Sequence, residues 1–300
     1  MSVTLQIQSV IYNSKKDLVV RSLKSLANAV KVNRNTVKDI GEVSVCLGDV
    51  SAEPIFTDSE LADFRAEFKD FFTLAYTFFG NEISVARCHN LLGESCKSDY
   101  IMIKDAEAVV CPRILSGMLE PFSDAKSNVG MVEARKTPLE DAKEYDRKTL
   151  ETEVASAACV MVSAEDFHAI SGFDADLFPY ALYGEDFSWR IRLNGKRLIY
   201  RPDCVVFCAE RLSASDECNE DSDEAYYSQE AALLMAYKWS NKELFKKLYD
   251  AFSAGDEIGK RVVTRFDQMK ADGKLPKPLE CNRKIAKFYG CSCAKNRYVI

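Results

Sequence analysis

The sequence predicts an α/β protein with a mostly parallel sheet flanked by helices, followed by a helical extension. Two observations carry this prediction. The first 125 residues repeat an order of apolar strand, polar turn and amphipathic helix, which is typical of an open, mostly parallel sheet. After residue 224, three amphipathic segments follow one another without an intervening strand. We therefore expect an α/β domain over residues 1–210 and a helical region with a basic tail over residues 211–300.

The apolar periodicity gives the order of the elements. Strands are expected at 3–12, 43–47, 73–79, 100–103, 129–133, 197–200 and 205–207. Helices are expected near 18–30, 61–71, 82 onward, 112–122, 163–170, 185–193, 224–239, 242–252 and 256–270. Residues 136–153 are charged and irregular, as in a mobile loop or lid, and residues 154–162 are a run of small apolar side chains. An acidic exposed loop is expected over residues 210–224.

Composition excludes several classes of protein. The chain has 300 residues, of which 47% are hydrophobic and 29% charged, and this is ample for a soluble globular core. A formal charge of -6 argues against nucleic acid as a partner. No apolar run approaches the roughly 20 residues of a membrane span, and no secretory leader precedes the first strand. The eleven cysteines are scattered through apolar segments, so we expect mostly buried, reduced thiols in a cytoplasmic protein.

Polar residues follow the predicted strands, at the edge of a parallel sheet where ligands bind. They include Tyr12, Asn13, Asp49, Asp105 and Glu107. Neither common glycine-rich phosphate loop is present, which disfavours a dinucleotide-binding protein or a P-loop NTPase. Asp105 and Glu107 are two residues apart, so their side chains would point the same way in an extended chain. They suit one Mg²⁺ or Mn²⁺ ion, although such carboxylates are also common solvated turn residues.

A second pair of carboxylates, Glu185 and Asp186, stands where a helix is expected to begin. The i,i+4 pairing of apolar residues predicts that helix, and Asn194-Gly195 predicts its end. Acids in a first turn oppose the helix dipole, which is one sufficient reason for their presence. The other interpretation is a general base at the end of a cleft, because the preceding segment is rich in aromatic residues.

The order of these motifs resembles the family-2 glycosyltransferases with the GT-A fold, especially the rhamnosyltransferase-like branch of bacterial surface-polysaccharide (cell wall) synthesis. The resemblance spans about residues 3–240. The matching segments are Ile11-Tyr12-Asn13, Gly48-Asp49-Val50-Ser51, Ala86-Arg87-Cys88-His89-Asn90, Asp105-Ala106-Glu107, and Gly172-Phe173-Asp174 followed by Glu185-Asp186 and Arg190. Each motif is short, and the specificity of the match comes from five of them in the same order.

The resemblance implies an inverting, metal-dependent transfer of a sugar from a nucleotide-diphosphate sugar to a hydroxyl group. It implies donor nucleotide contacts for Tyr12, Asn13, Asp49, Arg87 and Asn90. It implies that Asp105 and Glu107 hold Mg²⁺ or Mn²⁺. It also implies Asp186 as the general base, with Glu185 beside it. The expected acceptor contacts are Tyr183, Trp189 and Arg190. Tyr183 and Trp189 would stack on a sugar face or lie in the core, and both interpretations are open.

The implied donor is dTDP-rhamnose, with UDP-sugars as the alternative, and the implied acceptor is a growing cell-surface polysaccharide or a lipid-linked glycan. Two departures keep a second class of function open. The acidic motif is Asp-Ala-Glu rather than a sequence ending in Asp, and Cys208-Ala209-Glu210 stands where many relatives have a histidine. The alternative is therefore a GT-A-like binding or scaffold subunit of a polysaccharide-assembly complex, without catalysis.

The C-terminal part carries further expectations. The last 31 residues hold eight Lys or Arg against two acids, as in a solvated tail or a segment in peripheral contact with the cytoplasmic face of a membrane. The three helices before the tail would pack on the α/β domain or form a homodimer interface. Cys281, Cys291 and Cys293 lack the paired spacing of a zinc site.

Overall fold

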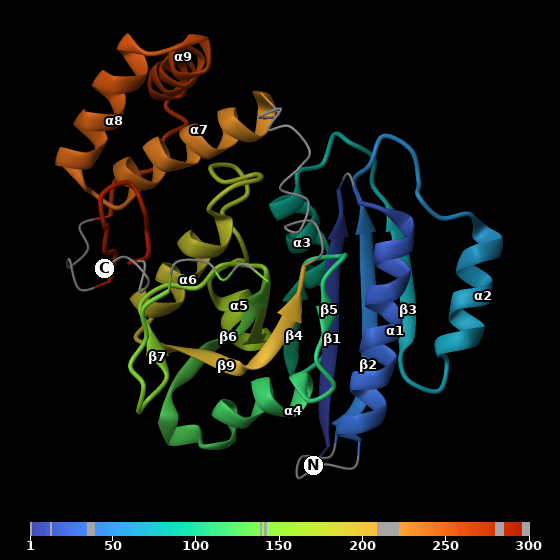
Figure 1. Ribbon diagram of the computed structural model, residues 1–300. Helices are drawn as coiled ribbons and strands as arrows, with labels where there is room; N and C mark the ends of the chain where they lie inside the picture. The colour runs from blue at the N-terminus through green and yellow to red at the C-terminus, as the bar shows by residue number, and fades with distance from the viewer. Residues whose placement is uncertain are drawn as a thin grey trace.

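The computed structural model describes residues 2–12, 14–34, 40–138, 140, 143–208, 222–279 and 285–295. These residues build a nine-stranded sheet with helices on both faces and three further helices beyond one end of it (Figure 1). The strands are β1 (Val3–Ile11), β2 (Ile40–Asp49), β3 (Thr73–Phe78), β4 (Tyr100–Lys104), β5 (Val109–Val110), β6 (Val129–Thr137), β7 (Glu151–Thr152), β8 (Cys159–Ser163) and β9 (Arg197–Phe207). The helices are α1 (Lys16–Asn33), α2 (Asp58–Phe68), α3 (Val85–Glu94), α4 (Ile114–Leu119), α5 (Ala164–Ala169), α6 (Tyr183–Leu193), α7 (Ser222–Lys238), α8 (Lys242–Ala254) and α9 (Glu257–Ala271), with two short 3₁₀ turns over 120–127.

The sheet runs in the order β3-β2-β1-β4-β8-β6-β9-β5, and β7 pairs with β9. Its first four strands pair in parallel, as the repeated strand–helix pattern predicts. Beyond β4 the pairing is mixed, because β8 is antiparallel to both neighbours while β6 and β9 are parallel. Six of the nine strands (β3, β2, β1, β4, β6 and β9) run in the same direction, so the expectation of a mostly parallel sheet is confirmed, with β8, β5 and β7 reversed.

Two apolar layers hold the helices against the sheet. On one face, α1, α2 and α4 contribute side chains such as Leu23, Phe68 and Leu115 to the largest core. On the other face, α3, α5 and α6 pack through Ala86, Phe167 and Phe187. The sheet is therefore covered on both sides, which explains why most residues of β1 and β4 are buried.

Several elements differ in extent from the sequence prediction. The two strands expected at 197–200 and 205–207 are one strand, β9, which continues through Pro202 with a register shift where it pairs with β6. The small-residue run 154–162 becomes a strand only from Cys159. The acidic loop expected at 210–224 falls mostly outside the described residues.

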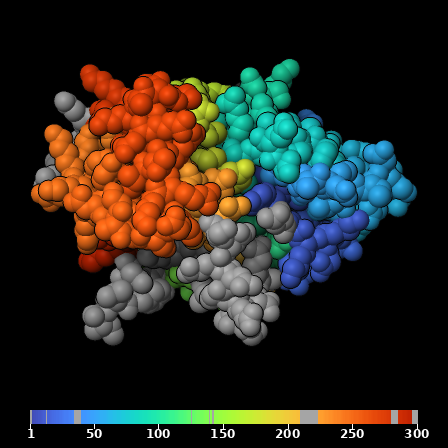
Figure 2. All heavy atoms as spheres, turned by 90° about the horizontal axis from the view of Figure 1, so that it is seen from above, coloured from blue at the N-terminus to red at the C-terminus, as the bar shows by residue number. Residues whose placement is uncertain are grey.

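The C-terminal helices pack against the α/β part through a third apolar cluster. Trp189 on α6 meets Trp239 at the end of α7 with ring centroids 5.3 Å apart, and Phe288 of the tail at 5.1 Å. Arg192 Nη1 also donates a hydrogen bond to the Ile285 carbonyl. The described tail over residues 285–295 is thus packed on α6 rather than being a solvated extension. Seen from above, α7–α9 in orange lie on one side and the blue-to-teal first strands and helices on the other (Figure 2).

Two expectations from composition can be compared with the described residues. Cys88, Cys159 and Cys204 are buried thiols, as expected. None of the helices in the described part of the chain is long and apolar enough to cross a bilayer.

Candidate active site

A cavity of about 750 Å³ lies at the carboxyl ends of β1 and β4. Its walls come from the residues after those strands, the N-terminus of α1, α3, residues 156–158, the segment leading into α6, and the first turns of α7. Its volume is within the range of about 300–1,000 Å³ that is usual for small-molecule sites. The position is the one at which parallel α/β sheets bind ligands.

The turn after β4 brings two carboxylates to this cavity. Asp105 and Glu107 both line it, as the sequence predicts. The prediction assumed an extended segment, in which the two side chains point the same way. The chain instead turns here, and the Glu107 backbone N–H donates a hydrogen bond to Asp105 Oδ1 at 3.0 Å. Glu107 Oε1 accepts a hydrogen bond from the Lys15 backbone N–H, while Glu107 Oε2 is buried with no hydrogen-bond partner. A buried carboxylate oxygen without a partner is costly, so it marks a place for a cation.

A buried lysine holds this acidic turn in place. Lys104 is 1% exposed, and its Nζ donates to Ser22 Oγ and to the Asp105 carbonyl, both at 2.6 Å. Ser22 Oγ in turn donates to the Ala108 carbonyl at 2.9 Å, so α1 is tied to both ends of the turn. Burial lowers the pKa of Lys104 to about 8, against the opposing effect of Asp105.

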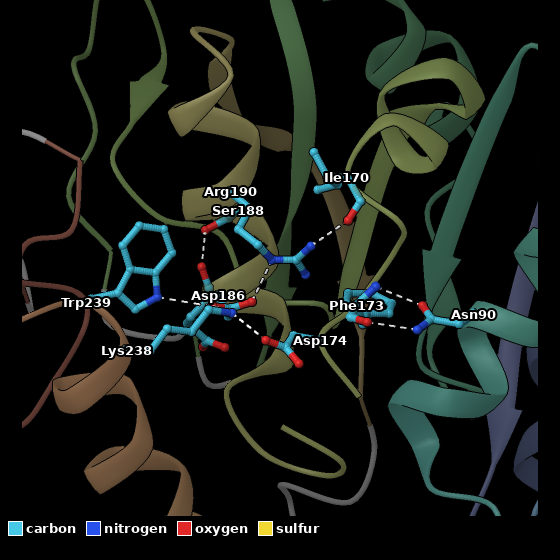
Figure 3. A network of polar contacts seen from close by, with 10 residues as sticks. Asn90, Ile170, Phe173, Asp174, Asp186, Ser188, Arg190, Lys238 and Trp239 are labelled. Atoms are coloured by element: carbon cyan, nitrogen blue, oxygen red, sulfur yellow. Dashed lines mark hydrogen bonds and ion pairs between the residues drawn. The ribbon is translucent and has the colours of Figure 1, made fainter. Parts of the chain in front are cut away.

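The two adjacent acids at the start of α6 have different surroundings. Glu185 lines the cavity. Asp186 is fully buried and does not line it. Arg190 Nε lies 2.7 Å from Asp186 Oδ2, and Lys238 Nζ lies 2.7 Å from Oδ1, which also accepts a hydrogen bond from Trp239 Nε1 at 3.0 Å (Figure 3). The oxygens of Asp186 are committed to three partners away from the cavity, so this geometry does not support Asp186 as the base facing the acceptor.

Close backbone packing brings Glu185 to the cavity. Gly184 lies against residues 156–158, and a Cβ at Gly184 would be 2.4 Å from the Ala157 backbone nitrogen. Glu133 fixes the start of this segment, because its Oε1 accepts hydrogen bonds from both the backbone N–H and the hydroxyl of Ser156 at 3.0 Å. Only glycine at position 184 permits this approach.

The acidic groups of the cavity lie around Tyr183. Burial, and then the charges of Asp105 and Glu185, raise the pKa of the Tyr183 phenol. Tyr183 lines the cavity as predicted, whereas Trp189 is fully buried in the C-terminal cluster. Arg190 is occupied by Asp186 and by the Ile170 carbonyl. Of the three expected acceptor contacts, only Tyr183 is in a position to meet a ligand.

Of the described residues expected to contact the donor nucleotide, Tyr12 lines the cavity and the others do not. Asn13 lies outside the described residues. Asp49 is fully buried and accepts hydrogen bonds from two backbone N–H groups and from the Tyr76 hydroxyl. Arg87 is exposed on α3 and does not line the cavity. Asn90 holds both backbone groups of Phe173 at 2.7 and 2.8 Å, so it fixes the Gly172-Phe173 turn.

Close packing leaves no room for a side chain at Gly48, near the carboxyl end of β2. A Cβ there would be 2.2 Å from Cys88 Sγ, so no larger residue fits without movement.

Several lining residues were not among the site residues predicted from the sequence. His89 is buried, and Gln8 Nε2 contacts its Nδ1 at 3.2 Å; burial lowers the pKa of His89 to about 3, so the ring is neutral. Tyr180 lines the cavity from the loop before α6. The α7 residues Asp223, Glu224, Tyr227 and Ser228 line it from a part of the chain more than a hundred residues beyond Glu107. Nothing in a local pattern indicates such a contribution.

The carboxylates fit a divalent metal without a complete protein cage. Within the described ranges, no group of three or more His, Cys, Asp or Glu side chains is arranged to hold a metal ion. Mg²⁺ and Mn²⁺ in phosphate-handling sites usually take one or two carboxylates and complete their shell with water and substrate phosphates. Asp105 and Glu107, with the unpartnered Oε2, meet that requirement.

Comparison with known proteins supports the fold. No family model matches the chain, and a search of curated proteins found no match. Among solved structures, GalNAc-T7 with UDP, GalNAc and Mn²⁺ superimposes with a TM-score of 0.59 at 12% identity, over 92% of this chain and 56% of that one. This chain thus spans little more than half the length of GalNAc-T7. The mannosyltransferase PcManGT from Pyrobaculum calidifontis, in complex with GDP-Man and Mn²⁺, gives 0.56 at 17% identity, over 93% of this chain and 82% of that one. Residues 1–349 of S. aureus TarS give 0.52 at 10% identity, over 90% of this chain and 92% of that one.

The chain has the GT-A fold. At these identities the likeness establishes the architecture, and the chemistry has to be argued from the cavity.

Proposed function

We propose that the protein is a metal-dependent glycosyltransferase that moves a sugar from a nucleotide-diphosphate sugar to a hydroxyl acceptor. One observation carries the proposal: in a GT-A fold, a single cavity contains Asp105 and Glu107, whose buried Oε2 has no hydrogen-bond partner, together with the carboxylate Glu185. The similar GalNAc-T7 and PcManGT structures contain UDP with Mn²⁺ and GDP-Man with Mn²⁺, respectively.

Asp105 and Glu107 would hold the divalent cation, which when bound neutralises charge on the leaving diphosphate. Lys104 and Ser22 keep the two carboxylates in place by fixing the backbone on both sides of them. Tyr12 lies where the nucleoside of the donor would meet the end of β1.

Glu185 is the general base in this proposal, replacing Asp186. The acceptor oxygen forms a bond to the anomeric carbon, and the bond from that carbon to the diphosphate oxygen breaks. The hydroxyl proton passes to the Glu185 carboxylate, and the nucleoside diphosphate leaves with the bonding pair. A single in-line displacement of this kind inverts the configuration at the anomeric carbon.

The finer identity of the substrates follows the family resemblance. The favoured donor is dTDP-rhamnose, with a UDP-sugar as the alternative, and the acceptor is a growing cell-surface polysaccharide or a lipid-linked glycan. The same resemblance suggests a cytoplasmic location with peripheral contact at the membrane. Formation of a homodimer by the C-terminal helices remains a prediction.

A thermal-shift and calorimetric screen of UDP, dTDP and GDP with Mn²⁺ or Mg²⁺ tests the proposal. We expect one nucleotide diphosphate to raise the melting temperature only when the metal is present, and its sugar ester to be hydrolysed slowly or transferred. Absence of binding by all three nucleotides with either metal would contradict the proposal and favour a scaffold subunit.

A further inference from the structure

A row of tyrosine rings crosses one wall of the cavity. Tyr12 and Tyr180 have ring centroids 5.5 Å apart, and Tyr180 and Tyr227 have centroids 4.4 Å apart. The three residues come from the end of β1, the loop before α6, and α7, and all of them line the cavity. Tyr12 is 42% exposed, and the other two are half-buried. The rings therefore form a surface to which three distant parts of the chain contribute.

The neighbouring Tyr226 shows how an ordinary packed tyrosine of α7 differs. Its hydroxyl donates to Glu230 Oε1 at 3.0 Å, and the Arg261 guanidinium lies 4.8 Å from its ring centroid. Tyr226 does not line the cavity. Successive residues of a helix point about 100° apart, so Tyr226 packs against the C-terminal helices while Tyr227 faces the cavity.

The charge of the cavity wall formed by α7 restricts which ligands can bind beside Tyr227. Asp223, Glu224 and Ser228 line the cavity beside Tyr227, whereas the lining lysines come from α1, β4 and β6. Asp223 and Glu224 stand in the first turn of α7, where they oppose the positive end of the helix dipole. This wall therefore repels phosphate and suits hydroxyl or ammonium groups, which can donate to carboxylates.

We propose that Tyr180 and Tyr227, with the carboxylates of α7, form a subsite for a neutral or amino-bearing sugar ring. Partly exposed tyrosine rings offer an apolar face and a polar edge, which matches the apolar face and hydroxyl edge of a pyranose. If the proposed function is correct, this ring belongs to the acceptor, so the acceptor residue bound here is a saccharide without phosphate. The C-terminal helical region is then a part of the substrate site.

Saturation-transfer NMR on the full chain tests the subsite with three probes: methyl glucoside, methyl glucosaminide and methyl glucoside 6-phosphate. We expect the first two to bind and the phosphorylated probe to bind more weakly. Tyr227→Leu retains apolar packing but removes the ring, and it should raise the Kd of the bound probes about tenfold. Tyr237→Leu is the matched control, since it makes the same change on the same helix at a ring that packs on Phe245 and Phe266 outside the cavity, and it should leave the Kd unchanged.

Equal binding by the wild-type chain and Tyr227→Leu, including no binding by either, would overturn the subsite, as would preference for the phosphorylated probe. Loss of UDP–Mn²⁺ binding in Tyr227→Leu with unchanged glycoside binding would assign the row to the donor nucleoside and also overturn it. The UDP–Mn²⁺ thermal shift of the wild-type chain separates the two proposals. Glycoside binding without any nucleotide binding would support the subsite and contradict the proposed glycosyltransferase activity.

Discussion

The molecule contains two clusters of carboxylates with opposite surroundings. At the turn after β4, Asp105 and Glu107 face a cavity, and one buried oxygen of Glu107 has no hydrogen-bond partner. At the junction of α6 and α7, Asp174 and Asp186 share Lys238 Nζ at 2.6 and 2.7 Å, and Asp186 also pairs with Arg190 (Figure 3). Among the described residues, no side-chain cation forms a salt bridge with the first pair of carboxylates, whereas Lys238 and Arg190 both pair with Asp186 in the second.

This difference distinguishes carboxylates that can bind a ligand from carboxylates that hold the helices together. An acid whose oxygens are all paired inside the protein has nothing left to offer a ligand, whereas an acid with an unpaired buried oxygen gains free energy when a cation arrives. Asp186 therefore joins α7 to the α6 helix, whereas its neighbour Glu185 lines the cavity. The network also fixes α7, the helix that carries Tyr227 to the cavity.

The largest expected effect comes from breaking the second cluster. Lys238→Met removes a cation that is 6% exposed and leaves Asp186 with fewer partners. We expect the free energy of unfolding to fall by about 3–5 kcal/mol, measured by urea denaturation. Lys242→Met, at the exposed start of α8, is the control and should change it by less than about 0.5 kcal/mol. A Lys238→Met protein as stable as the wild type would mean that the network does not hold the helices together.

A smaller effect is expected for the pair Asp105 and Glu107, where a substitution should weaken metal binding without lowering stability. Glu107→Gln should weaken the binding of Mn²⁺ with UDP by at least about tenfold, since even outer-shell partners of a metal contribute that much. Stability should be unchanged or higher, because the substitution removes a buried negative charge of which one oxygen, Oε2, has no hydrogen-bond partner. Asp99→Asn, near the opposite end of β4, provides a calorimetric control that keeps metal binding. Unchanged Mn²⁺ binding in Glu107→Gln would remove this residue from the metal site.

The smallest effect concerns His89 and pH. Burial lowers the pKa of His89 to about 3, below the value of about 6.5 in an unfolded chain. The unfolded state then binds more protons between these values, so stability is lost as the pH falls from about 6.5 toward 3. The loss is at most about 1.4 kcal/mol per pH unit. Urea denaturation at pH 7 and pH 5 should show it, and His89→Gln should flatten that dependence. An unchanged slope in His89→Gln would assign the acid sensitivity to other groups.

The sequence predicted the parallel half of the sheet well because its signals are local. Apolar strands such as 100–103 and polar turns such as Asp105–Glu107 identify themselves within a few residues. The same is true of α6, whose start and end lie close to the positions expected from Glu185 and Gly195. Mixed pairing beyond β4 has no such local signal, since it depends on which strand lies beside which.

The roles of Glu185 and Asp186 could not be separated from sequence for a similar reason. Adjacent helical residues point about 100° apart, so the two carboxylates have different surroundings, and the sequence does not show which of them lines the cavity. Which one it is depends on Lys238 and Trp239, more than fifty residues later, which bury Asp186. Asp49 and Asn90 likewise match a motif but are engaged by Tyr76 and Phe173. A motif indicates which residue types meet, and packing decides which atoms remain available.

Turnover of the nucleotide sugar by Glu185→Gln and Asp186→Asn, measured side by side, tests the central claim most directly. We expect Glu185→Gln to lose about 10²–10⁴-fold in kcat while keeping nucleotide binding and a melting temperature close to that of the wild type. Asp186→Asn should lower the melting temperature and, assayed cold where it is folded, retain most of the turnover. Wild-type turnover in Glu185→Gln, or an Asp186→Asn protein that is fully stable and inactive, would contradict the account.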